Sequence, residues 1–184
     1  MDIRKYTKNR LSKELLKIAG KESDMQILCI GSDQIMGDCL GPLVGHILTK
    51  EYAFPFPVYG TLKSPVNALN LPMVWEGIKN NYTIAIDAAV TSETAKKRIG
   101  IIKIEPGSLK PGTALKRELP AVGSISIKGL VSHQHEPLTT VNLGLVMTMA
   151  EYVASEIITF AQKHHVMQIK EAAATQELPL RNLI

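Results

Sequence analysis

Short runs of apolar residues alternate with stretches of helical periodicity along most of this chain. The leucines of residues 10–19 fall on one side of a helix ahead of Gly20, which predicts an amphipathic helix. Continuous apolar runs at 25–30 and 82–86 are typical of buried strands. The other predicted strands are 54–59, whose two prolines favour a sheet edge, then 99–104 and 124–131. Further helices are predicted at 40–52, at 65–79 behind Ser64 as a cap, and from Thr139 or Thr140 to about 165, with a turn-rich segment at 106–123.

This alternation of strands and helices indicates βαβ units, so we expect an α/β fold with three α-β-α layers around a mainly parallel sheet. We interpret residues 1–184 as a single domain, with an N-terminal helix within 1–22, a core over 23–167 and a C-terminal tail or short arm over 168–184. Ligand sites in such folds lie beyond the carboxyl ends of the strands. The loops expected there are 31–38, 60–64, 87–92 and 132–137.

Composition narrows the class of protein. Of 184 residues, 45% are hydrophobic, enough for a sizeable core without disulfides or metals. The two cysteines have no framework spacing, and residues 1–22 lack a signal-type apolar stretch, so we expect a cytoplasmic protein. No continuous apolar run approaches the roughly 18 residues of a membrane span. The net charge of +4 is scattered and aromatics make up only 5%, which does not favour nucleic-acid binding. We therefore predict neither nucleic-acid nor membrane partners and leave a homo-oligomer open.

The loop after the first buried strand carries Asp33 and Asp38 around a helix start. It has neither the Gly-x-Gly-x-x-Gly of dinucleotide sites nor the Gly-Lys-Ser/Thr of a P-loop. Asp38 is therefore either a site carboxylate or a cap for the N–H groups of the following helix. Cys39, next to it, is either a nucleophile or, as we favour, a small apolar filler.

A second carboxylate, Asp87, closes the apolar run at 82–86. A carboxylate in that position is costly to desolvate unless it is paired or faces a cleft, so it is either a site residue or a hydrogen-bonded anchor. If Asp38 and Asp87 face each other, they could share a proton or hold a divalent metal. His133 and His135 form a His-x-His pair that would point both rings to one side of an extended segment, although a solvated polar loop is the simpler interpretation.

Several ordered motifs between residues 25 and 160 resemble the sporulation protein family of YyaC. They are 31–33 with 37–45, 60–62 with 65–71, 85–88, 107–112, 116–120 and 123–131. That family is similar to the germination protease of spores and, more distantly, to hydrogenase maturation proteases, which share a phosphorylase/hydrolase-like α/β fold. The resemblance implies that Asp38, in Gly-Asp-Cys-Leu-Gly-Pro, and Asp87, in Ala-Ile-Asp-Ala, are the catalytic pair. Hydrogenase maturation enzymes also place a histidine with two carboxylates around a metal, and His133 is the candidate for that ligand.

Our hypothesis is a spore peptidase-like protein of sporulating bacteria, acting in the cytoplasm or spore interior on a peptide or protein substrate such as a spore protein. Asp38 and Asp87 would be its acid and base. Ser32 and Asp33 would support the pair, and Thr61 and Ser64 would line the cleft. The alternatives are a non-catalytic peptide- or partner-binding protein and a metal-dependent hydrolase of another amide.

Overall fold

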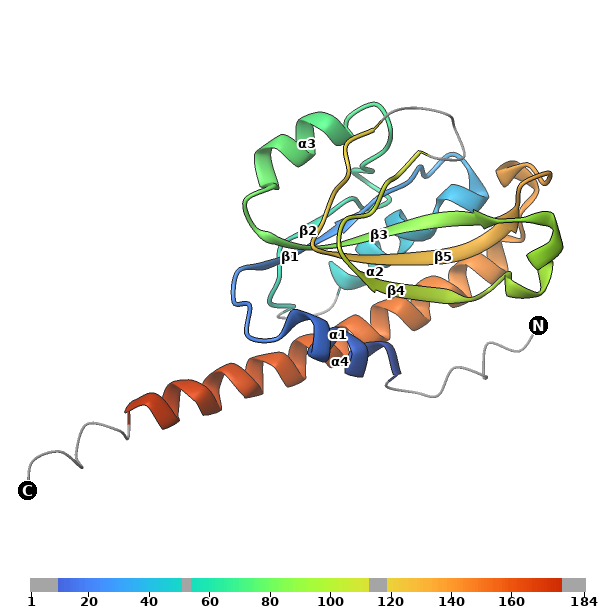
Figure 1. Ribbon diagram of the computed structural model, residues 1–184. Coiled ribbons are helices and arrows are strands. Elements are labelled where there is room, and N and C mark those ends of the chain that lie inside the picture. The colour runs from blue at the N-terminus through green and yellow to red at the C-terminus, as the bar shows by residue number, and fades with distance from the viewer. Residues whose placement is uncertain (1–9, 51–53, 113–118, 177–184) are drawn as a thin grey trace, which may run out of the picture.

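The computed structural model describes residues 10–50, 54–112 and 119–176, which include one five-stranded sheet (Figure 1). The strand order is β2-β1-β3-β5-β4, in which β2, β1, β3 and β5 are parallel neighbours and β4 pairs antiparallel with β5. The predicted α/β fold with a mainly parallel sheet is therefore confirmed. β2 lies at an edge, as the prolines at 55 and 57 indicated, but it is shorter than the predicted strand 54–59. The strands are β1 (Met25–Cys29), β2 (Val58–Tyr59), β3 (Tyr82–Thr91), β4 (Ile102–Pro106) and β5 (Ile125–His133).

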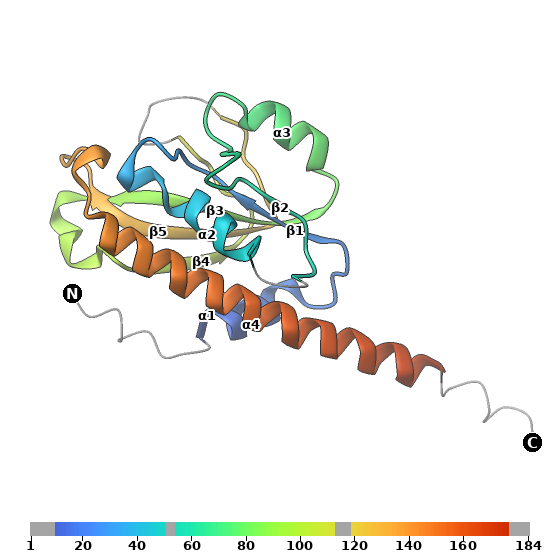
Figure 2. The same cartoon turned by 180° about the vertical axis from the view of Figure 1, so that it is seen from behind.

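Helices cover both faces of the sheet (Figures 1 and 2). One face packs against α1 (Arg10–Ala19), α2 (Leu40–Leu48) and α4 (Leu143–Gln176), and the other against α3 (Leu71–Ile78). Strand residues alternate between the two cores, since Ile84 faces the larger helical layer and Ala85 the α3 side. The three-layer prediction is therefore correct.

A buried polar contact fixes α1 against α4. The backbone N–H of Ser12 donates to Glu156 Oε2 at 2.9 Å, and the two residues are 0% and 3% exposed. Ser12 lies in the first turn of α1, where backbone N–H groups have no partner within the helix and attract negative charge. Glu156 therefore holds the N-terminal helix on the helical layer.

The predicted start of the third helix was wrong. Val66 forms a parallel bridge with Ile30, and the chain then turns through Asn67, whose N–H donates to Asn70 Oδ1 at 2.8 Å. Asparagine side chains that bond nearby backbone groups stabilise turns at the expense of helix. For this reason α3 begins only at Leu71, and Ser64 is not its cap.

Three elements run further than their patterns predicted. β3 continues to Thr91 instead of ending at Asp87, and β5 continues to His133. Helix α4 reaches Gln176, so the first part of the predicted C-terminal arm is the end of this helix, which projects beyond the sheet (Figure 1). Residues 177–184 lie outside the described residues.

One segment of α4, Leu143–Ile169, is long and apolar enough to cross a membrane by length and composition, with a hydropathy of 1.4. Within its most apolar window 44% is buried inside the protein, and that side includes core residues such as Val153 and Ile157. A core helix of a globular protein passes the same test, so this segment is weak evidence for a membrane span. The predicted absence of a membrane partner stays a prediction.

Candidate active site

The topology predicts a crevice between the carboxyl ends of β1 and β3. From β1 the chain first adds β2 on one side and then crosses over to add β3 on the other. Loops that leave two neighbouring strands in opposite directions open a crevice, where ligands of such sheets bind. The last β1–β3 pair is Cys29 with Ile86, so Asp87 is the first residue of β3 beyond the end of β1. Asp87 is therefore at the end of the neighbouring strand and not, as predicted, at the end of its own.

The loop after β1 folds back so that Asp38 returns to the strand end. The N–H of Ser32 donates to the Asp38 backbone carbonyl at 3.1 Å, and the N–H of Ile30 donates to the Ile86 carbonyl at 2.7 Å. Gly31 makes this closure possible, because its φ is 144° and a Cβ there would lie 2.0 Å from the Asp38 carbonyl oxygen. The glycine thus positions one carboxylate of the site.

Asp38 does not cap the following helix. The residue at the start of α2 is Cys39, and no side-chain hydrogen bond caps that helix in the described structure. Burial raises the pKa of the half-buried Asp38 carboxyl to about 6, and a hydrogen bond from the Ser32 backbone N–H offsets part of this effect. The capping interpretation of Asp38 was therefore wrong.

Asp87 carries the more strongly perturbed carboxyl group. Burial raises its pKa well above the ordinary value, the charge of Asp38 raises it further, and the Ala88 backbone N–H and Lys128 lower it. The two aspartates are thus close enough to interact electrostatically. Asp38 loses its proton first, while Asp87 is still neutral. The negative charge of Asp38 then makes the ionisation of Asp87 less favourable. Between the pKa values of the two groups the arrangement holds one ionised and one protonated carboxyl.

Lys128 is a site residue that sequence reasoning missed. It is the register partner of Asp87 on β5, and side chains of paired parallel residues project from the same face of a sheet. Its ammonium group also lies 3.3 Å from Glu105 Oε2 on β4. The signal was a charged residue inside the otherwise apolar run 124–131, on the strand next to the one carrying Asp87.

The predicted supporting residues make local contacts. Ser32 Oγ accepts the N–H of Gln34 at 3.2 Å, while Asp33 is exposed. Thr61 and Ser64 close a tight turn after β2, in which each N–H donates to the carbonyl of the other at 3.0 and 3.2 Å. Their contribution to a substrate cleft stays a prediction.

Cys39 fits the filler interpretation better than the nucleophile interpretation. It is 6% exposed and belongs to the larger core. Burial, followed by the charges of Asp33 and Asp38, raises the pKa of its thiol. A nucleophilic cysteine needs the opposite shift, toward the thiolate.

His133 lies against two glutamates. Its Nδ1 is 3.0 Å from Glu93 Oε2 and its Nε2 is 3.6 Å from Glu136 Oε2. Because β5 ends at His133 and His135 follows in an exposed turn, the extended His-x-His geometry assumed from the sequence was wrong. Within residues 10–50, 54–112 and 119–176, no three His, Cys, Asp or Glu side chains gather as a metal site. The three-donor site implied by the hydrogenase maturation enzymes, with His133 beside Asp38 and Asp87, is therefore not assembled in this arrangement.

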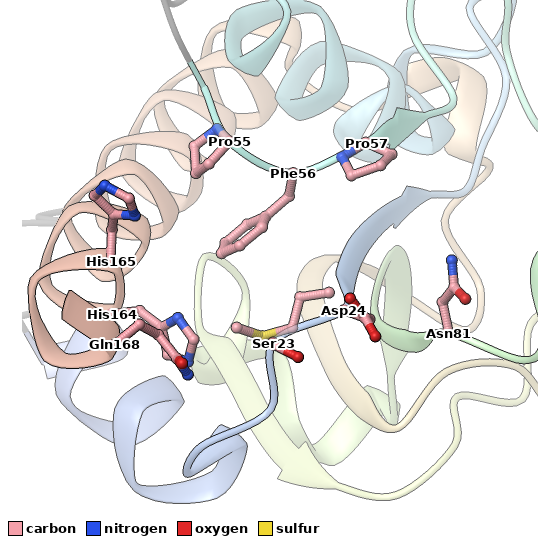
Figure 3. A pocket seen from close by; sticks show the side chains of 10 residues that line it. Ser23, Asp24, Pro55, Phe56, Pro57, Asn81, His164, His165 and Gln168 are labelled. Carbon is pink, nitrogen blue, oxygen red and sulfur yellow. The ribbon is translucent and has the colours of Figure 1, made fainter. Parts of the chain in front are cut away.

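A separate cavity of about 540 Å³ opens at the other end of the sheet (Figure 3). Its walls include Met25 and Asn81, at the amino ends of β1 and β3, with Phe56 and His165 facing it from other elements. It lies opposite the carboxyl-end crevice, where ligands of this fold class bind. We therefore keep the candidate site at Asp38 and Asp87.

Comparison with known proteins agrees with this fold. Over 152 residues the chain is 40% identical to YyaC of Bacillus subtilis (strain 168), a protein described as uncharacterized, covering 78% of this chain and 72% of YyaC. The structure is similar to the crystal structure of the [NiFe] hydrogenase maturation protease HycI from Thermococcus kodakarensis KOD1, with a TM-score of 0.56. That match covers 81% of this chain and 99% of HycI at 16% identity, so it concerns the fold alone. Both resemblances expected from the sequence are thereby confirmed. The chain belongs to the family described as "Protein of unknown function (DUF1256)", which matches residues 2–156.

Proposed function

We propose that this protein is a peptidase that hydrolyses peptide bonds with Asp38 and Asp87 as a general base and general acid. The observation that carries the proposal is the placement of two interacting carboxyl groups, both with raised pKa, at the switch point of the sheet. Neighbouring carboxyl groups whose environments separate their pKa values are the usual means of obtaining an acid and a base from one residue type. The fold similarity to a maturation protease supports the same reaction class.

The order of the pKa values assigns the roles. Between the pKa values of the two groups, Asp38 is ionised and accepts a proton from a water molecule as that water attacks the carbonyl carbon. Asp87, protonated in that interval, gives its proton to the carbonyl oxygen, where negative charge would otherwise develop, and takes it back when the intermediate collapses. When the tetrahedral intermediate collapses, Asp38 returns its proton to the leaving amine. Both carboxyl groups then regain their starting states.

The substrates that the proposal favours are peptides or proteins of the cytoplasm or spore interior. This part rests on the resemblance of Gly-Asp-Cys-Leu-Gly-Pro and Ala-Ile-Asp-Ala to the catalytic motifs of the spore germination protease. Spore proteins are accordingly the first substrates to test.

The test is to assay cleavage by the Asp38→Asn and Asp87→Asn variants, using spore-protein extracts and peptide mixtures. Loss of a general acid or base costs about 10²- to 10⁴-fold, so each variant should fall at least a hundredfold below the native rate. Asp24→Asn is the matched control, because Asp24 lines the cavity at the other end of the sheet. Cleavage at the native rate by both site variants would end the proposal. Capture of a peptide without turnover by the native protein would favour the non-catalytic alternative.

A further inference from the structure

One edge of β3 has free backbone hydrogen-bonding groups beside the two aspartates. Residues Tyr82 to Ile86 pair with β1, but in the described chain residues 87–91 pair with β5 alone (Figure 1). On the β1 side, strand β3 therefore presents an unpaired edge that begins at Asp87. The residues of this edge are half-buried, so they belong to the crevice and not to the closed core.

The direction of these backbone groups follows from two hydrogen bonds. The carbonyl of Ile86 accepts the N–H of Ile30 and therefore faces β1, whereas the carbonyl of Thr91 accepts the N–H of Gln134 and faces β5. Backbone groups alternate sides along a strand, and five steps separate these two residues, as regular alternation requires. The irregularity in this region lies on β5, where residue 131 is skipped in the register. The C=O group of Ala88 and the N–H and C=O groups of Val90 therefore point to the free side, whereas the Ala88 N–H already bonds the Asp87 carboxyl group.

We infer that this edge binds the substrate as an added β-strand, so that the ligand is an extended segment of polypeptide. This inference rests on the proposed function only in that the bound segment is then cut; the binding of an extended segment does not depend on cleavage. Donors and acceptors repeated every two residues, about 6.6 Å apart, match the backbone of another extended chain. A compact small molecule would pair with the donor and acceptor of only one residue.

The register would bring one peptide bond directly to the carboxyl pair. A segment paired at Ala88 lies next to Asp87, the preceding residue, and beside Asp38 across the end of β1. Ala88 and Ala89 carry only methyl groups, so bulky side chains of the bound segment find room on either face of the strand. Met36, 42% exposed on the 3-10 turn Met36–Asp38 that packs near β3, adds an apolar contact. The edge therefore favours extended, apolar segments.

The experiment uses peptides selected from a random dodecapeptide library on phage, with the full-length Asp38→Asn/Asp87→Asn protein as bait so that nothing is cut. The selected peptides are then tested against the same bait with Val90→Pro or Val90→Ala added. Proline removes the Val90 N–H on the free side and no β3–β5 hydrogen bond, and it is tolerated at strand edges. Alanine is the matched control, because it removes the side chain and keeps the N–H. We expect Val90→Pro to weaken binding at least tenfold and Val90→Ala to weaken it less than threefold.

A second measurement does not depend on the folding of a variant. Each amide of a selected peptide is N-methylated in turn and its affinity for the unmodified edge is measured. Strand pairing predicts that methylation weakens binding at every second residue and has little effect between. Failure to select any peptide, equal loss in both Val90 variants, or a methylation profile without the two-residue period would overturn the inference. If peptides are selected and their methylation profiles show the two-residue period, but the native protein cuts none of them, only the proposed peptidase function would be overturned.

Discussion

We expect the Asp38 carboxyl group to be needed for function but to lower the stability of the folded protein, and replacing Asp38 by Asn tests this directly. The carboxyl has a pKa of about 6 in the folded protein instead of the ordinary 3.8, so folding disfavours its ionised form. Asn has nearly the same shape, keeps an oxygen for the N–H of Ser32, and cannot ionise. The Asp38→Asn protein is therefore expected to be more stable than the native protein at neutral pH.

The size and pH dependence of the effect follow from linkage. The folded state binds the Asp38 proton more tightly than the unfolded state, so the contribution of Asp38 to native stability falls as pH rises from about 4 to 6 and is level above that range. At about 1.4 kcal/mol for each pKa unit, the difference between 3.8 and about 6 corresponds to at most about 3 kcal/mol. For a chain of this length that is a rise of roughly 6–12 °C in melting temperature.

The assay is thermal and urea unfolding of the native and Asp38→Asn proteins from pH 4 to pH 8. The stability gap should be near zero at pH 4 and should open in favour of the variant by pH 7. A variant that is less stable at pH 7, or a gap that does not change with pH, would refute the desolvation of Asp38. Asp24→Asn, the same substitution at the other end of the sheet, is the matched control.

Other predictions concern residues around the site and the core. Lys128→Met removes a charge that lowers the pKa of Asp87, so the alkaline limb of the pH–rate profile should move to higher pH; an unmoved limb would contradict the role of Lys128. Glu156→Ala strips the acceptor from the buried N–H of Ser12 and should cost about 1–3 kcal/mol, with faster hydrogen exchange throughout α1. Glu156→Gln keeps an acceptor oxygen, so its stability should lie between those of the native protein and Glu156→Ala. Unchanged hydrogen exchange in α1 of the Glu156→Ala protein would show that the contact does not hold the helix.

The sequence predicted the features whose patterns depend on burial alone, such as β1, α1 and the mainly parallel sheet. It failed where a distant partner decides the conformation. Residues 87–91 lack an apolar run, yet they continue β3 because β5 pairs with them. The bridge between Ile30 and Val66, which no local pattern contains, holds the chain extended before the asparagine turn that precedes α3.

The sequence likewise predicted only part of the candidate site. Asp38 and Asp87 were identified mainly by resemblance, since a carboxylate near a helix start is as often a cap. Their mutual electrostatic effect and the partner Lys128 depend on the register of three strands, which the sequence does not specify. Of the two glutamate neighbours of His133, Glu136 is only three residues further along the chain, but Glu93 comes from the 3-10 helix Glu93–Arg98, and no local pattern connects it to His133.

The most direct test of the central claim is a pH titration of the aspartate carboxyl carbons by NMR, in the native protein and in the two Asn variants. In the native protein Asp38 should titrate near pH 6, and Asp87 should titrate after it, well above the ordinary aspartate range. Asp38→Asn should lower the pKa of Asp87, because the charge of Asp38 raises it, whereas Asp87→Asn should leave Asp38 near 6, because Asp87 is neutral when Asp38 titrates. Two aspartates that titrate near pH 4, each unaffected by loss of the other, would contradict the acid–base pair.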